Sequence, residues 1–88
     1  MKKIVTVTEV EGEGLVSLLG QNVTMFCGNY IYAGKLAGVN NTCALLENAR
    51  IVYETGDLKA GKFRDAQYLP NAWYIQINAI ESFGLMEG

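Results

Sequence analysis

The chain has 88 residues, of which 50% are hydrophobic and 18% charged, so it is long enough for one globular domain with a modest core. Its net charge of −2 has the wrong sign for binding nucleic acid by bulk electrostatics. The absence of histidine excludes His-based acid–base catalysis and His metal ligands, and the two cysteines fit no zinc or redox-pair spacing. We therefore expect no enzyme, no metal and no cofactor.

Residues 1–13 combine a basic start with loosely alternating isoleucine, valine and threonine, which predicts an extra strand or an extended arm. Thr6, Thr8 and Glu9 interrupt the apolar part, so it lacks the continuous core of a signal peptide. No run reaches the roughly 18 apolar residues of a transmembrane helix. The sequence therefore predicts a cytoplasmic protein that does not bind membranes.

Residues 14–20 predict a short N-terminal helix. Leu15, Leu18 and Leu19 recur at the i, i+3 and i+4 positions of one helix face, and Gly20 is typical of a C-terminal stop. A helix of one to two turns is not stable alone, so we expect it to dock on the rest of the domain.

Three consecutive strands are predicted, over residues 23–27, 30–39 and 42–46. Gly28-Asn29 separates the first two strands, since it is a turn signal between strand-forming residues. Asn40-Asn41 ends the second strand, because asparagine tolerates left-handed backbone and bonds its own main chain. Gly34 lies in the middle of the second strand and predicts a sharp bend there.

The rest of the chain predicts more strand structure around one long loop. Residues 48–54 continue or restart the third strand, 72–77 alternate in the manner of a strand, and 80–83 form a last short one. Residues 56–71 are the least apolar region and contain the only proline, which predicts a long loop. The expected fold is mainly β: a strongly bent antiparallel sheet of five strands after a short helix.

The order of these elements resembles the Sm-like (LSm) family. Residues 32–40 are similar to the first Sm motif, in which an aromatic, a glycine, an aliphatic and a loop Asp or Asn recur at this spacing. Residues 23–26 resemble the first strand of the bacterial Hfq host factor, and 78–83 resemble the strand that closes the second motif. Residues 45–53 resemble Sm-like proteins of bacteriophages. The resemblance covers residues 15–83 apart from the long loop.

The resemblance implies a single SH3-like small barrel over residues 1–88 that assembles into a homo-oligomeric ring through its edge strands. The segment 73–77 has no charged residue to protect an edge, and an unprotected apolar edge is an association site. Ring closure would remove such edges. The candidate subunit-interface residues are Trp73, Tyr74, Gln76, Ile80 and Phe83.

The resemblance also implies single-stranded RNA as a partner. In the family an aromatic stacks on a base, an Asn bonds its edge, and an Arg or His closes the pocket. Here Thr42 and Ala44 occupy the first two positions, the second motif offers Gln76 and Asn78, and Asn40 stands where the family has its loop Asp. The candidate RNA-binding residues are Asn40, Asn41, Gln76 and Asn78.

Two functions follow from these patterns. The first is an RNA-binding or RNA-associated ring with a degenerate uridine site, which the usual role of the family favours. The second is a structural or protein-interaction ring without RNA binding, which the acidic pI and the residues Thr42 and Ala44 favour. The lysines and the arginine of segment 56–71 could meet phosphates, but two aspartates offset their charge.

Overall fold

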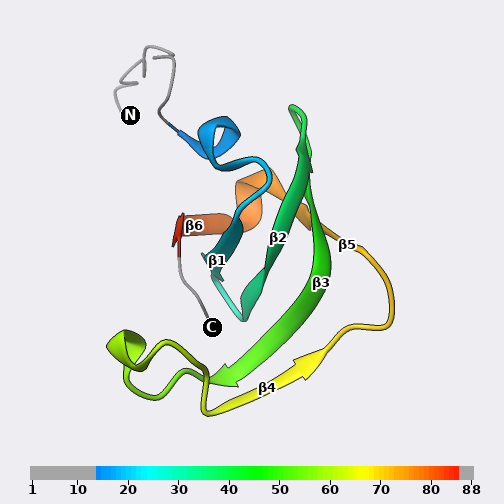
Figure 1. Cartoon of the computed structure of the whole chain (residues 1–88). Coiled ribbons are helices and arrows are strands. Elements are labelled where there is room, and N and C mark those ends of the chain that lie inside the picture. Colours follow the sequence, from blue (N-terminus) through cyan, green and yellow to red (C-terminus); the bar gives the residue numbers. More distant parts are fainter. Residues whose placement is uncertain (1–13, 86–88) are drawn as a thin grey trace.

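The computed structural model describes residues 14–85, which form one six-stranded antiparallel sheet with three short 3-10 turns (Figure 1). The strands are β1 (Asn22–Cys27), β2 (Ile31–Val39), β3 (Cys43–Glu54), β4 (Asp65–Tyr68), β5 (Trp73–Gln76) and β6 (Ile80–Leu85). The turns are η1 (Leu15–Leu18), η2 (Leu58–Ala60) and η3 (Ile77–Ala79). The prediction of a mainly β fold is confirmed. No helix between residues 14 and 85 has the length and apolar character needed to cross a membrane.

Two elements differ from the expectation. The short N-terminal helix is a single 3-10 turn, η1, between Gly14 and Gly20, which both have positive φ. Residues 56–71 are not one long loop, because they contain η2 and β4, so the sheet has six strands and not five. Most of β4 is exposed and it lacks apolar alternation, which is why its sequence did not predict a strand. The strand or arm expected over 1–13 lies outside the described residues.

At Gly34, where the sequence predicts a sharp bend, the structure shows an irregular pairing of β2 with β3. Strands β1, β2 and β3 pair in succession, and the β2–β3 register shifts between Ala33 and Lys35. A Cβ on Gly34 would lie 2.9 Å from the backbone oxygen of Glu47 and 3.1 Å from the Cα of Ala49. Only glycine therefore lets β2 approach β3 this closely.

Strand β3 is the longest, and its two halves pair with different strands. Its first half pairs with β5, with Leu46 opposite Trp73, and its second half pairs with β4, with Arg50 opposite Tyr68. Asn48 lies between the halves with φ of 52°, a left-handed conformation that asparagine tolerates. Residues 48–54 thus continue the third strand, which curves between its two partners (Figure 1).

The core is built by β1, β2, β3 and β5, with leucines of η1 packed against it. Its buried members are Val23, Met25, Leu36, Ala44, Leu46, Ala49 and Ile75. Strand β6 pairs with β1, and η3 joins β5 to β6, but no ladder joins these two strands in the described part of the chain. Within residues 14–85, the outer edges of β4, β5 and β6 are consequently unpaired.

Candidate functional site

The β2–β3 turn is held by the side chain of Asn40. Its Oδ1 accepts hydrogen bonds from the backbone N–H groups of Thr42 (2.8 Å) and Cys43 (2.9 Å) and from the Thr42 hydroxyl (3.1 Å). These bonds form an Asx-turn, in which an asparagine side chain imitates the backbone. The side-chain oxygen of Asn40, a candidate RNA-binding residue, is therefore already used to hold the turn.

The other three candidate RNA-binding residues line one open hollow of about 600 Å³, which we call the amide hollow. Its lining residues are Asn41, Thr42, Cys43, Tyr74, Gln76, Ile77 and Asn78. The β2–β3 turn supplies one wall, and the end of β5 with η3 supplies the other. Cys43 pairs with Gln76, and the Ile77 N–H donates to the Thr42 carbonyl at 2.8 Å, so backbone bonds hold the two walls together. Asn40 lies beside this hollow and lines a smaller one.

The amide hollow is polar and uncharged. None of the described residues that line it carries a formal charge, and its polar groups include three carboxamides, one hydroxyl and one phenol. Carboxamides donate and accept hydrogen bonds, so they can pair with the edges of nucleobases. The arrangement can recognise a flat polar group, but it offers no charge to neutralise a phosphate.

Tyr74 is a residue of this hollow that the sequence analysis assigned only to the subunit interface. Its side chain is 67% exposed beside the three carboxamides. Residues i and i+2 of a strand share a face, so the spacing of Tyr74 from Gln76 could have identified it. The ring offers a stacking surface that Thr42 lacks. Ala44, which stands at the family's Asn position, is fully buried and cannot reach a ligand.

A second open hollow, of about 470 Å³, is lined by all four residues of β5 and by the β1–β2 turn, and we call it the aromatic hollow. Its lining residues are Cys27, Gly28, Asn29, Tyr30, Tyr32, Trp73, Tyr74, Ile75, Gln76, Asn78, Ala79 and Glu81. The ring centres of Tyr30 and Tyr32 are 6.3 Å apart, with an angle of 59° between the ring planes.

Burial alters the titration of two groups in the aromatic hollow. It raises the pKa of the Cys27 thiol, and the negative charge of Glu81 raises that pKa further. Burial also raises the pKa of the Tyr32 phenol, with smaller contributions from Cys27 and Tyr30.

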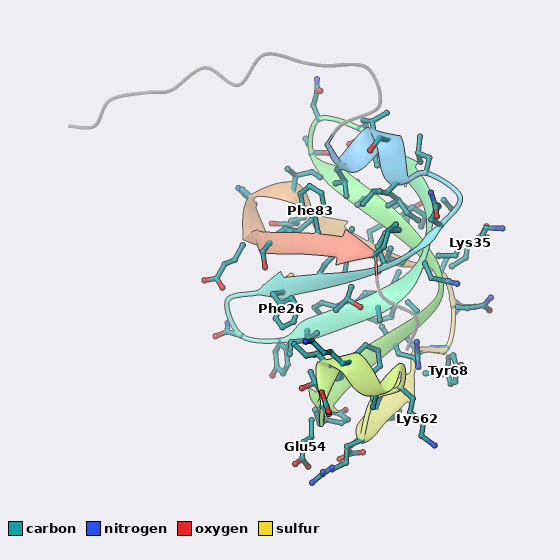
Figure 2. All side chains as sticks on the ribbon, turned by 60° about the vertical axis from the view of Figure 1, so that its left-hand side comes forward. Phe26, Lys35, Glu54, Lys62, Tyr68 and Phe83 are labelled. Atoms are coloured by element: carbon teal, nitrogen blue, oxygen red, sulfur yellow. The ribbon has the colours of Figure 1, made fainter. Side chains whose placement is uncertain are left out.

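The predicted interface residues are distributed over β5 and β6, each of which has one edge without a partner among residues 14–85. Trp73 and Tyr74 lie on β5, and Phe83 lies on β6, where it is 41% exposed. Ile80 is partly buried against the core, so it contributes to packing within the chain. Gln76 lines both hollows. Other exposed apolar side chains of these edges are Tyr68 on β4 and Leu85 on β6; Figure 2 shows Phe83 and Tyr68 at separate places on the molecule.

The cations around β4 contact neighbours within the chain. The Arg50 guanidinium lies 5.0 Å from the Phe63 ring centre and 5.5 Å from that of Tyr68, which are cation–π distances. Arg64 Nη1 lies 3.5 Å from Glu54 Oε2. Both guanidinium groups therefore have partners within the chain.

The described residues contain no group of three or more Cys, Asp or Glu side chains that could hold a metal ion. Cys27 and Cys43 are free thiols. No protein-family model matches the chain, and no curated protein sequence matches it significantly. The two hollows and the free strand edges of residues 14–85 are therefore the features that bear on function.

Proposed function

We propose that the chain is an Sm-like, ring-forming protein that binds single-stranded RNA weakly through the amide hollow. One observation carries this proposal: Asn41, Gln76 and Asn78 line a single hollow together with the exposed ring of Tyr74. Base stacking on an aromatic ring and hydrogen bonds to base edges are the two interactions by which proteins recognise unpaired RNA bases.

The order of the elements supports the Sm-like part of the proposal. A short helical turn precedes antiparallel strands, the second strand carries the close approach at Gly34, the third is long and curved, and η3 precedes the last strand. The sequence resemblance described above has the same order.

Assembly into a ring is supported by two unlike, unpaired edges. One edge is formed by β4 and β5 and the other by β6, and both carry exposed apolar side chains. An unpaired apolar edge favours association with another strand. Pairing of one edge with the different edge of the next copy is a head-to-tail contact, and such contacts generate rings when the rotation closes.

RNA binding is tested by fluorescence anisotropy with labelled oligo-U, oligo-A and mixed oligonucleotides at two salt concentrations. Tyr74→Leu should weaken binding about 5- to 150-fold, because loss of one stacked base costs about 1–3 kcal/mol. Gln76→Ala and Asn78→Ala should also weaken it, whereas Asn71→Ala removes an exposed amide that lines a different hollow and should not. We expect a shallow salt dependence, since the lining of the amide hollow is uncharged.

The neutral lining and the net charge of −2 favour a second function, a structural ring that does not bind RNA. Native mass spectrometry of the same preparation separates the two. A ring that binds none of the oligonucleotides would establish the structural function. RNA binding that is unchanged in Tyr74→Leu, Gln76→Ala and Asn78→Ala would place the RNA site elsewhere on the molecule.

A further inference from the structure

The aromatic hollow has a chemical character that RNA binding leaves unexplained. Four aromatic residues line it, Tyr30, Tyr32, Trp73 and Tyr74, and Glu81 is the charged side chain among its lining residues. No lysine or arginine of the described chain lines it. It therefore combines aromatic rings with one negative charge.

Two separate parts of the fold supply the rings. Tyr30 directly precedes β2 and Tyr32 lies in it; their ring centres are 6.3 Å apart and the ring planes are inclined by 59°. Strand β5 supplies Trp73 and Tyr74 to the lining, and Glu81 belongs to β6. Glu81 is exposed at the rim of the lining, where its carboxylate is open to a bound cation.

This combination attracts cations and repels anions. The faces of aromatic rings carry partial negative charge, and alkylated ammonium groups bind to several such faces at once. A nucleotide placed here would bring its phosphate towards Glu81 with no cation in the lining to compensate. The volume of about 470 Å³ lies in the range of small-molecule sites.

We propose that the aromatic hollow binds a trimethylammonium cation, with the rings of Tyr30, Tyr32 and Trp73 around the methyl groups and Glu81 as the counter-charge. The two hollows share Tyr74, Gln76 and Asn78, whereas Tyr30 and Glu81 line the aromatic hollow and not the amide hollow, so variants of Tyr30 and Glu81 test this site separately from RNA binding. The head group could come from a free small molecule or from a trimethylated lysine side chain.

Trp73 is the only tryptophan, so its intrinsic fluorescence reports directly on ligands in this hollow. The assembled wild-type protein is titrated with choline, with Nε-trimethyllysine and with dimethylbutanol, the uncharged carbon isostere of choline. We expect a saturable fluorescence change with the two cations and binding of the isostere that is about tenfold weaker. The tighter of the two cations identifies the source of the head group. Calorimetry gives a readout that does not involve the tryptophan.

Three variants locate the binding. Glu81→Gln and Tyr30→Leu should each weaken choline binding several-fold while oligo-U binding stays unchanged. Tyr53→Leu is the matched control, because Tyr53 is exposed but does not line the aromatic hollow, and it should bind choline like the wild type. Circular dichroism confirms that each variant is folded.

Three results would overturn the site. Equal affinity for choline and dimethylbutanol would mean that the positive charge is not recognised. Tighter binding of adenosine monophosphate than of choline would mean that the hollow takes nucleotides. Choline binding to a monomeric Phe83→Asp variant but not to the assembled wild type would mean that a neighbouring copy fills the hollow.

Discussion

At Gly34 the absence of one carbon atom allows β2 to lie against β3. Gly34→Ala would place a Cβ 2.9 Å from the Glu47 oxygen, so one strand must move. We expect the free energy of unfolding to fall by about 1–3 kcal/mol, the usual effect of overpacking, in urea unfolding monitored by circular dichroism. Gly38→Ala is the control, because its Cβ would lie 3.8 Å from the nearest side-chain atom. Equal stabilities of the two variants would contradict the close approach.

Cys27 and Tyr32 predict a loss of stability at alkaline pH. Because burial raises both pKa values, the unfolded chain releases these protons at a lower pH than the folded chain. Their contribution to stability is fully present below about pH 9 and is lost as the pH rises through the folded pKa values. We expect thermal unfolding temperatures to fall above about pH 9, and to fall less in the double variant Cys27→Ala, Tyr32→Phe. If the unfolding temperature fell equally steeply with pH in the wild type and in the double variant, Cys27 and Tyr32 would not be the groups responsible.

At the scale of the element, the β2–β3 turn depends on one acceptor oxygen. Asn40→Ala removes the acceptor of the Thr42 and Cys43 N–H groups and should lower the free energy of unfolding by about 1–2 kcal/mol. Asn40→Asp keeps an oxygen in that place and should retain most of the stability. Because this turn forms one wall of the amide hollow, we also expect Asn40→Ala to bind RNA more weakly than the wild type. Asn40→Asp should also bind RNA more weakly, although its stability should be close to that of the wild type. Thermal unfolding of the two variants checks the structural role of the Asn40 oxygen. Equal losses of stability in Asn40→Ala and Asn40→Asp would disprove it.

At the scale of the whole molecule, two unlike edges predict that two defective chains can complement each other. Tyr74→Asp blocks the β4–β5 edge and Phe83→Asp blocks the β6 edge, so each variant alone should be monomeric. A mixture has one intact edge of each kind, and native mass spectrometry should detect a one-to-one heterodimer. Leu58→Asp adds the same charge at an exposed site in η2 and should leave assembly unchanged.

Other outcomes of the mixing experiment separate the modes of assembly. If each edge paired with its own counterpart, both variants would still form dimers alone through their intact edges, and mixing them would produce no heterodimer. A wild type that is monomeric by native mass and light scattering would end the ring proposal, while leaving the tests of the two hollows open.

The sequence by itself determined the features that depend on neighbouring residues. Alternation with a period of two predicts β1, β2 and β5, since side chains of a strand point to opposite faces. Asn40-Asn41 predicts the turn between β2 and β3, because asparagine bonds its own main chain. Gly34 predicts a sharp bend of β2, and the structure shows a close approach to β3 at this position. The resemblance to the Sm motifs predicts Asn41, Gln76 and Asn78 as RNA-binding residues.

The tertiary structure alone decided the features that depend on pairing between distant segments. Strand β4 forms because the second half of β3 offers it a partner, although its own sequence has no strand pattern. The oxygen of Asn40 is committed to the turn, and Tyr74 joins the amides, because β3–β5 pairing sets the end of β5 beside that turn. Local sequence preference is worth about 1 kcal/mol for a residue in a strand, so long-range packing and pairing decide such positions.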